Sequence, residues 1–400
     1  MVSQVKRLTF TYNGHLFDPL WVILDEQSSP PLLPLLFSLH LARYGVVYDW
    51  RVTSDEIFRR RVSLLNEREV SDATIRSYIY CLANFCSYLD RCQVLSQTPG
   101  MHASSACSQR FVNHYLNTVL ADTLDSHQSL NLHRSALVAY FNWLTVMEIS
   151  PRLELRVDRR TRQSMAEKCN KQHYIQYVSR YWRFELLNTC KTLAEKLVIR
   201  MGFEVGLRTK ELMGLRVSGK NSLVSLFEQL ENDDFSHVDQ FRYRLEGRYT
   251  KGGKSRWIYF ERLLLEDMQR YFQTERRWLT NRTGGDDGIF FLRTSQQFSG
   301  TGIGERHGSN LFHVRAREAG LNPLLSFHDL RHTFATELFH SELSGHDGRE
   351  TRSESAALIV VAHRLGHAIG KDGQASFVTT KYIRMRLQML QMEEAVNGRP

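Results

Sequence analysis

The segment His328-Asp329-Leu330-Arg331-His332-Thr333 places polar side chains at the start of a helical pattern, where packing alone would not require them. His328 and Arg331 are three residues apart, and residues at this spacing lie on one face of a helix. The apolar pattern that follows, from Leu330 to Phe339, has helical spacing. The segment therefore predicts a helix whose first turn presents an imidazole and a guanidinium together.

A second polar group lies upstream, in Gly206-Leu207-Arg208-Thr209-Lys210-Glu211-Leu212. Arg208 and Glu211 are within reach of each other on one helical turn. Taken alone, this spacing is more typical of a surface ion pair. The Arg208–Glu211 spacing supports a functional site only in combination with the other polar segments.

The stretch from Phe241 to Phe260 alternates apolar and polar residues on both sides of Thr250-Lys251-Gly252-Gly253-Lys254. This pattern predicts a β-hairpin with a Gly-Gly turn. Gly253-Lys254-Ser255 is similar to the end of a phosphate-binding P-loop. The earlier glycine, Gly247, is one position too far, and a hairpin is not a strand-to-helix turn, so we do not predict an ATPase.

The last polar group combines Leu365-Gly366-His367 with Thr379-Thr380-Lys381-Tyr382. Tyrosines in such regions are usually packing residues. His363 and His367 have the i, i+4 spacing of metal ligands, but no third ligand follows at fitting spacing, and a zinc site needs three or four. We therefore predict no metal.

Composition favours a polyanionic partner. The 400-residue chain carries a formal charge of +9, which suits nucleic acid or an acidic membrane face. Residues 30–47, the most apolar opening stretch, include His40, Arg43 and prolines, so they do not predict a membrane span. We expect no membrane partner and a cytoplasmic protein, associated with a bacterial nucleoid.

The chain predicts a mainly α fold with a small antiparallel β-sheet. Residues 1–54 form an N-terminal extension of unknown role, and residues 55–150 have the apolar spacing of a helical bundle. Residues 151–171 are basic and poor in large apolar side chains, which suits an interdomain linker. Residues 172–400 form a second domain that contains every polar group described above.

These residue types fit chemistry on a phosphodiester. Attack on phosphorus places negative charge on two non-bridging oxygens, which the guanidinium forks of Arg208 and Arg331 match. Tyr382 is the candidate nucleophile, because an aryl phosphodiester retains the bond energy for rejoining. A tyrosine with a pKa of about 10 needs local positive charge or a base, which His328 or His367 can supply.

The departing sugar oxygen needs a proton, and a lysine on a hairpin turn is a suitable general acid. Lys251 fits this role, with Lys254 as the alternative.

Taken in order, the six candidates resemble the site of the tyrosine recombinase (phage integrase) family: Arg208, Lys251, His328, Arg331, His367 and Tyr382. The resemblance covers roughly residues 170–396 and, more loosely, residues 55–150, which look like the family's SAM-like core-binding domain. It implies an α+β catalytic domain, a C-shaped clamp around double-stranded DNA and a 3′-phosphotyrosine intermediate. It also implies that the protein uses no metal and no other cofactor.

The resemblance further implies a homo-tetramer on paired recombination sites that exchanges strands through a Holliday junction. By analogy, Glu211 orients the Arg208 region, and the helix after Tyr382 docks on a neighbouring protomer. Three stretches depart from the family pattern: residues 219–240, 341–355 and 370–374. We expect them to be surface-loop insertions, which cost little free energy.

The expected function is therefore site-specific DNA recombination or integration, with accessory proteins as further partners. Two alternatives stay open. One is a type IB-like topoisomerase that uses the same chemistry on one strand at a time. The other is a catalytically silent DNA-binding protein that serves an architectural role.

Overall fold

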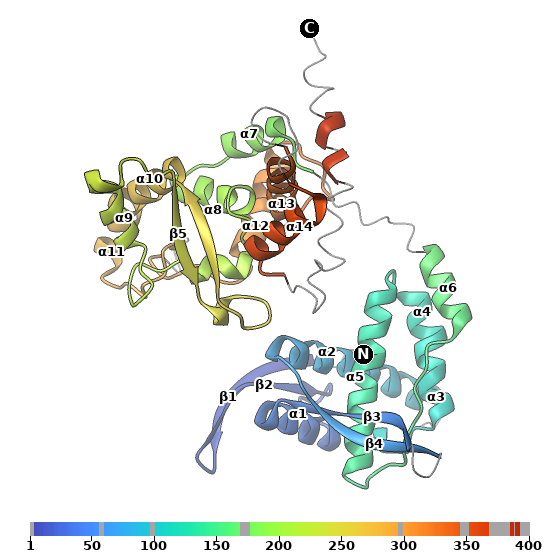
Figure 1. Cartoon of the computed structure of the whole chain (residues 1–400). Helices are drawn as coiled ribbons and strands as arrows, with labels where there is room; N and C mark the ends of the chain where they lie inside the picture. Colours follow the sequence, from blue (N-terminus) through green and yellow to red (C-terminus); the bar gives the residue numbers. More distant parts are fainter. Residues whose placement is uncertain are drawn as a thin grey trace. The chain divides into compact units, whose positions relative to one another are not determined.

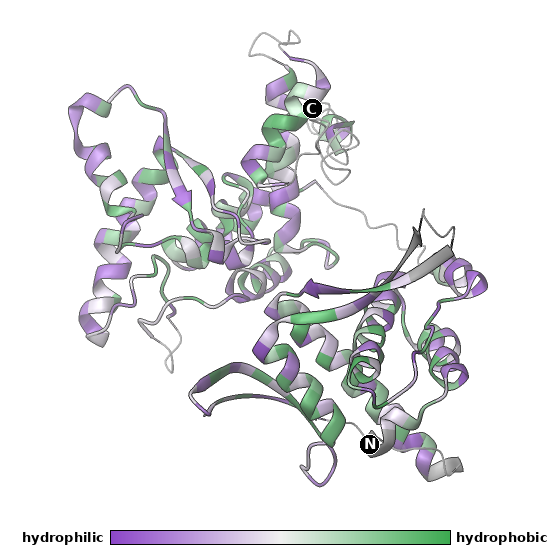
Figure 2. Cartoon of the chain, turned by 60° about the horizontal axis from the view of Figure 1, so that its bottom comes forward, coloured by the Kyte–Doolittle hydropathy of each residue, from purple (hydrophilic) through white to green (hydrophobic). Residues whose placement is uncertain are grey.

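The computed structural model describes residues 4–55, 60–96, 101–168, 177–294, 299–344, 352–367, 385–387 and 389–392. The chain divides into two compact units, Met1–His173 and Tyr174–Pro400, and each has its own hydrophobic core (Figure 1). Figure 2 shows apolar residues gathered where the helices of each unit meet. The predicted mainly helical fold is confirmed, and the described strands form three two-stranded antiparallel sheets.

The first unit begins with two hairpins and continues as helices. Its strands are β1 (Gln4–Tyr12), β2 (His15–Leu24), β3 (Val46–Asp55) and β4 (Arg60–Glu69). Its α-helices are α1 (Leu32–Tyr44), α2 (Asp72–Ser96), α3 (Gln109–His114), α4 (Leu120–Thr123), α5 (His127–Val146) and α6 (Arg159–Lys168). A 3₁₀ segment, η1 (Met101–Ala106), follows α2, and a π-helical segment, η2 (Tyr115–Val119), joins α3 to α4.

Helices α1, α2 and α5 share the core of the first unit. Ser71 caps the N-terminus of α2, because its hydroxyl oxygen accepts a hydrogen bond from the Thr74 backbone N–H at 3.3 Å. Phe37 of α1 packs its ring 5.3 Å from that of Tyr140 and 5.6 Å from that of Trp143, both on α5. Burial of these aromatic faces holds the helices together.

Residues on both sides of the expected boundary at residue 54 contribute to this one core. The boundary falls within the β3–β4 hairpin, and Leu41 and Val47 are buried together with Ile79 of α2. Residues 151–168, expected to be a linker, also reach it, since Leu155 and Met165 are buried in the same cluster. The described residues of the N-terminal extension thus pack with the helices that follow them.

The second unit holds the remaining elements. Its α-helices are α7 (Arg180–Asn188), α8 (Leu193–Phe203), α9 (Val224–Glu231), α10 (Arg262–Tyr271), α11 (Arg277–Thr283), α12 (His307–Glu318), α13 (Phe327–Leu343) and α14 (Glu354–Leu365). Its strands are β5 (Gln240–Leu245) and β6 (Arg256–Glu261). Short turns are the 3₁₀ segments η3 (Thr209–Gly214), η4 (Asp233–Phe235) and η5 (Gly247–Tyr249) and the π-helical η6 (Phe272–Arg276).

Helix α13 lies at the centre of this unit, against α8 on one side and α14 on another (Figure 1). Gly202 permits the close approach of α8, because a Cβ there would lie 2.8 Å from the Cβ of Leu330. The approach brings the first turn of α13 beside the end of α8 and the turn that follows it. This is the region that contains Arg208.

The predicted hairpin is confirmed as β5 and β6, whose last pair is Leu245 with Arg256. The predicted Gly-Gly turn is wrong in detail, since residues 246–255 connect the strands and include η5. Gly252 and Gly253 do adopt left-handed backbone angles, with φ of +88° and +71°. The connection is thus longer than a two-residue turn.

The expected surface-loop insertion at residues 219–240 contains a helix. Leu226 and Phe227 of α9 are buried in the main core of the second unit, and α9 packs against α10. The expectation of a simple loop is therefore wrong for this stretch. Among the helices that the structure describes, none has the length and apolarity that a bilayer crossing requires.

The packing of α1 leads to a stability prediction. Phe37→Ala removes a side chain that is 1% exposed, so the free energy of unfolding of the first unit should fall by about 3–5 kcal/mol. The measurement is urea unfolding of the full chain, followed by tryptophan fluorescence. The neighbouring Leu36→Ala is the control, because Leu36 is 40% exposed and should change stability by about 0.5 kcal/mol or less. Equal effects would show that α1 is not part of the core.

Candidate active site

Glu211 lies at the centre of a cluster of charged side chains in the second unit. Its side chain is fully buried in η3. One oxygen, Oε2, accepts a hydrogen bond from the Arg208 backbone N–H at 2.8 Å, and the other, Oε1, accepts one from the Arg208 guanidinium at 2.9 Å. The pair is therefore not the surface ion pair that its spacing alone favoured.

Arg331 reaches the same carboxylate from α13. Its guanidinium lies 3.4 Å from Glu211 Oε2 and also donates to the carbonyl oxygens of Gly206 and, at 2.6 Å, Leu365. The Arg331 side chain is only 1% exposed, whereas that of Arg208 is 24% exposed. The two predicted clamp arginines thus meet at one carboxylate, with Arg208 as the more open of the two.

Arg256 is a third arginine of the cluster, and the sequence analysis missed it. From β6 it donates to Glu211 Oε2 at 2.7 Å and to the Arg364 carbonyl oxygen at 2.5 Å. A signal was present in the strand pattern, because Arg256 occupies the same buried face as Ile258 and Phe260. An arginine in register with core residues of a strand indicates a buried charge that needs a partner.

The end of α14 supplies backbone acceptors to two of these arginines. The carbonyl oxygens of Arg364 and Leu365 are in its last turn, where the helix dipole places partial negative charge. Gly366 ends the helix in a left-handed conformation, with φ of +67°. A Cβ at this position would lie 2.7 Å from Cδ of Arg256, so the lack of a side chain at Gly366 leaves room for the Arg256 side chain.

Burial and charge act in opposite directions on Glu211. Burial would raise its pKa, but the charges of Arg256 and Arg331 lower it below the ordinary value of 4.5, with further lowering from Arg208. Glu211 is therefore ionised at neutral pH. The cluster contains one negative and three positive charges, which leaves a net positive site.

Burial and the positive charge of the cluster lower the pKa of the two predicted histidines. Burial and the charges of Arg331 and Arg208 lower the pKa of His367 to about 4. The same causes, in the same order, lower the pKa of His328. His332 is buried, and its ring lies 4.4 Å from the His328 ring.

Lys251 lies in the connection between β5 and β6 and is exposed. Its charge is among the causes that lower the pKa of His328, which places it in the same electrostatic environment. The Thr250 hydroxyl stabilises this connection, because its oxygen lies 2.9 Å from the Gly247 carbonyl oxygen and 2.7 Å from that of Lys254, and its single O–H can donate to either. Lys254 is exposed as well.

Tyr382 lies outside the described residues, so its position relative to the arginines is not given by the structure. The described part of the chain resumes at Met385, whose side chain is buried against α13. The Met385 sulfur accepts a hydrogen bond from the Thr336 hydroxyl at 3.7 Å. Within the described residues, no group of three or more His, Cys, Asp or Glu side chains is arranged to hold a metal ion.

The structure thus brings together Arg208 and Arg331 at Glu211, adds Arg256, and places His328, His367 and Lys251 in the surrounding field. Such an array can bind an oxyanion with charge-assisted hydrogen bonds. Its neutral imidazoles can accept or relay a proton.

Two family models match the chain. The model of the phage integrase family matches residues 184–347. The model described as the phage integrase N-terminal SAM-like domain matches residues 62–147. The first range contains the arginine cluster, and the second contains α2 and α5.

Two curated relatives match about half of the chain. Tyrosine recombinase XerA of Pyrococcus horikoshii is 24% identical over 215 residues, which cover 54% of this chain and 61% of that protein. Tyrosine recombinase XerD of Shewanella oneidensis is 26% identical over 204 residues, which cover 51% and 54% of the two chains. The chain thus spans less than two thirds of each relative.

Solved structures also resemble the chain. The Tn1549 transposon integrase in complex with transposon right end DNA aligns with a TM-score of 0.49 at 12% identity, over 91% of this chain and 98% of that one. A lambda integrase dimer bound to a COC′ core site aligns with a TM-score of 0.44 at 12% identity, over 79% and 72%. On the strength of the two family models and the two curated relatives, the chain belongs to the phage integrase family of tyrosine recombinases.

Proposed function

We propose that this protein is a site-specific DNA recombinase or integrase that cleaves and rejoins DNA through a covalent phosphotyrosine. The observation that carries the proposal is the convergence of Arg208, Arg256 and Arg331, from three separate segments, on the single carboxylate of Glu211. A net positive, largely buried site of this kind suits a phosphodiester whose charge increases in the transition state.

In this proposal the scissile phosphate binds at Arg208 and Arg331. Arg208 offers the more exposed guanidinium, while Arg331 contributes its charge from a buried position. Glu211 and the last carbonyls of α14 hold the guanidiniums in place. Pre-oriented donors of this type need little reorganisation when the phosphate charge develops.

Tyr382 is the proposed nucleophile. Its phenol oxygen forms a bond to phosphorus while the bond from phosphorus to the 5′ oxygen breaks, which leaves a 3′-phosphotyrosine and a 5′ hydroxyl. Tyr382 is three residue steps from Met385, with two residues between them, and three steps span at most about 11 Å when extended. Met385 contacts Thr336, which is five residues beyond Arg331 on α13, or about 7.5 Å along the helix axis. The tether is compatible with attack within one subunit.

Proton transfer is assigned to the remaining predicted residues. With a pKa of about 4, His367 is neutral at pH 7 and is suited to accept a proton, and His328 is shifted in the same direction. Lys251 is the proposed general acid for the 5′ oxygen. Its contribution to the electrostatics of His328 favours it over Lys254.

The domain roles extend the proposal to the whole chain. The first unit, in which the expected bundle of residues 55–150 shares its core with Leu155 and Met165, and the catalytic domain of residues 172–400 would each contact double-stranded DNA. Two bound sites would assemble four protomers, with accessory proteins as further partners. The protein would act in the cytoplasm, at the nucleoid.

Covalent trapping tests the proposed function. Duplexes that cover the DNA flanking the gene in its native genome are each nicked, so that cleavage releases a short fragment and the covalent complex persists. The wild-type protein should give a complex that resists denaturant, and Tyr382→Phe should give none while its DNA affinity stays within about twofold, because only bond formation needs the phenol oxygen.

Tyr181→Phe is the matched control, since Tyr181 is exposed on α7 and should not affect trapping. Trapping that survives in Tyr382→Phe would remove this residue from its role. Absence of trapping in the wild type on every duplex would favour the silent DNA-binding alternative. A supercoiled plasmid with paired sites completes the test, since relaxation without recombinant products would indicate a topoisomerase.

A second prediction concerns Glu211. Glu211→Gln leaves buried Arg256 and Arg331 without their counter-charge, so the free energy of unfolding at pH 7 should fall by about 3–5 kcal/mol. Because the folded-state pKa of Glu211 is lowered, its stabilisation is complete above its ordinary pKa of 4.5 and is lost as the pH falls through the lower folded value. The difference between wild type and variant should therefore shrink in acid.

Urea unfolding at several pH values measures this difference. Glu246→Gln is the control, because Glu246 forms an exposed pair with Arg248, and such pairs contribute at most about 1 kcal/mol. A Glu211→Gln deficit no larger than that of Glu246→Gln, or one that is constant down to acid pH, would contradict the assigned role.

The third prediction is the titration of His367 in the free protein. Nuclear magnetic resonance of its ring, assigned with His367→Gln, should show a midpoint near pH 4. Arg208→Gln should raise this pKa toward 6.5, because it removes one of the charges that disfavour the imidazolium. A midpoint near pH 6.5 in the wild-type protein would contradict the geometry of the cluster.

A further inference from the structure

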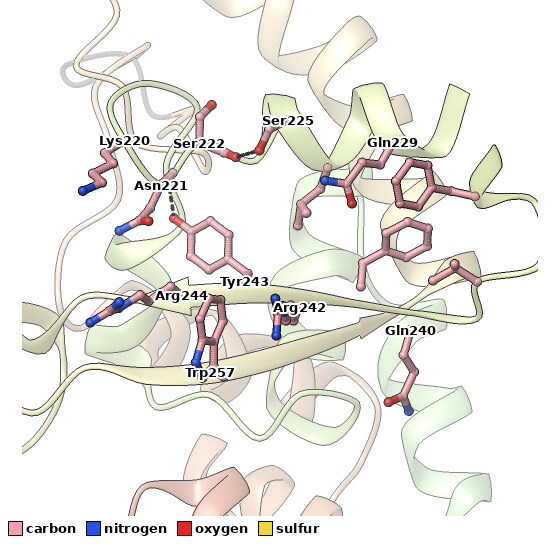
Figure 3. A pocket seen from close by; sticks show the side chains of 14 residues that line it. Lys220, Asn221, Ser222, Ser225, Gln229, Gln240, Arg242, Tyr243, Arg244 and Trp257 are labelled. Carbon is pink, nitrogen blue, oxygen red and sulfur yellow. Dashed lines mark hydrogen bonds between the residues drawn. The ribbon is translucent and has the colours of Figure 1, made fainter. Parts of the chain in front are cut away.

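A groove of about 530 Å³ runs along β5 in the second unit, between the strand and the segment that leads into α9 (Figure 3). The groove is lined by residues between Lys220 and Gln229, by Phe235 and Val238, by residues 240–244 of β5 and by Trp257 of β6. All of its lining residues are described by the structure, and none of them carries a carboxylate. Most of this groove belongs to the stretch of residues 219–240 that departs from the family pattern.

Three cations line the groove: Lys220 and Arg244 lie toward one end, and Arg242 lies nearer its middle (Figure 3). All three are exposed, and among the described residues no carboxylate pairs with any of them. Other arginines of this unit do have carboxylate partners, among them Arg200, Arg276 and Arg315. The three cations are therefore available to an anion from outside.

Trp257 orients two of these cations. Its ring is 43% exposed, and the guanidinium carbons of Arg242 and Arg244 lie 5.0 Å and 5.9 Å from its centroid. A guanidinium held against an aromatic ring keeps its N–H edges free for hydrogen bonds. Arg242 and Arg244 are two residues apart on one strand, about 7 Å, which is comparable to the separation of successive phosphates on a DNA strand.

Hydrogen bonds of the Tyr243 hydroxyl connect β5 to the opposite side of the groove. Its hydroxyl lies 2.9 Å from the Gly214 carbonyl oxygen and 3.0 Å from that of Asn221, and it accepts a hydrogen bond from the Arg216 backbone N–H at 3.2 Å. The loop that carries Lys220 is thereby joined to β5.

The groove is separate from the candidate active site. Arg256 and Trp257 are consecutive on β6, so their side chains point to opposite faces of the hairpin. Arg256 is buried at Glu211, whereas Trp257 faces the groove. A phosphate bound beside Trp257 is therefore not the phosphate bound at Arg208.

We propose that this groove, with Lys220, Arg242, Arg244 and Trp257, is a second DNA-binding surface that contacts the backbone of duplex DNA outside the cleavage site. The proposal rests on the proposed function, which brings DNA to the same unit. Planar, stacked guanidiniums suit phosphate oxygens, and the neutral donors Asn221, Ser222 and Gln229 are of the types that contact DNA backbones. Of the apolar aliphatic and phenyl side chains in the lining, Leu226 and Phe241 are buried in the core, and Phe235 and Val238 are partly buried against it. The exposed lining is therefore mainly the cations and Trp257, which suits a backbone phosphate better than the apolar anchor of a peptide.

Salt dependence of DNA binding tests this proposal. The affinity of the full chain for a long duplex of random sequence is measured by fluorescence anisotropy at a series of salt concentrations. Arg242→Gln/Arg244→Gln should reduce the slope of log affinity against log salt by about 1.8, and Lys220→Gln by about 0.9, because each lost phosphate contact removes about 0.9. Affinity at low salt should fall several-fold in the double variant.

Arg277→Gln/Arg282→Gln is the matched control. It removes the same charge from α11, where Arg282 also stacks on an exposed tryptophan, Trp278, outside the groove. This control should keep the wild-type slope. Equal slopes for wild type, groove variants and control would overturn the proposal, as would equal losses in groove variants and control.

Two further measurements separate the alternatives. Binding of poly-glutamate that is lost in the groove variants, together with an unchanged DNA slope, would overturn the proposal and assign the groove to an acidic protein segment. Covalent trapping through Tyr382 is scored independently on the same variants and should persist, because none of the groove residues belongs to the candidate active site. Normal trapping together with an unchanged salt slope in the groove variants would reject only the proposal about the groove. Absence of trapping in the wild-type protein would reject the proposed function, and the salt slopes of the variants could still be compared.

Discussion

One buried carboxylate determines the arrangement of the second unit's polar centre. Glu211 accepts hydrogen bonds from arginines at the N-cap of η3, on β6 and on α13, so it links three segments that are far apart in the sequence. Removing one partner from a buried ion pair costs about 3–5 kcal/mol, because the remaining charge stays buried without compensation. The same contacts that hold these segments together also orient the guanidiniums that the proposed chemistry requires. Stability and function therefore depend on the same residue.

Local spacing was sufficient to predict the elements that carry this centre. The hairpin and the first turn of α13 follow from alternation and helical periodicity, both of which act within a few residues. The grouping of Arg208 and Arg331 came from chemistry and resemblance. Arg256 was missed because its partner is distant in sequence, and only the tertiary structure shows which carboxylate neutralises a strand arginine that faces the core.

Two segments were harder to predict for the same reason. Residues 1–54 looked like a separate extension, but Phe37 and Leu41 bury their side chains against helices that come much later in the chain. Residues 219–240 looked like a polar loop, although Leu223, Leu226 and Phe227 have helical spacing within it. Whether a short run of apolar side chains is buried depends on whether another helix or strand packs against it. The residues around that run do not show which distant segment does so.

The packing of α9 has an evolutionary consequence. Leu226 and Phe227 lie in the same hydrophobic core as the residues around η3 and α13, so the segment that borders the basic groove is also an internal part of the catalytic unit. Lys220 and the outward arginines of β5 can be substituted one at a time without disturbing this packing, because their side chains are exposed. Deleting residues 219–240 would instead expose the core, so we expect related chains that contain this segment to retain the helix even where the charges on its neighbours have diverged.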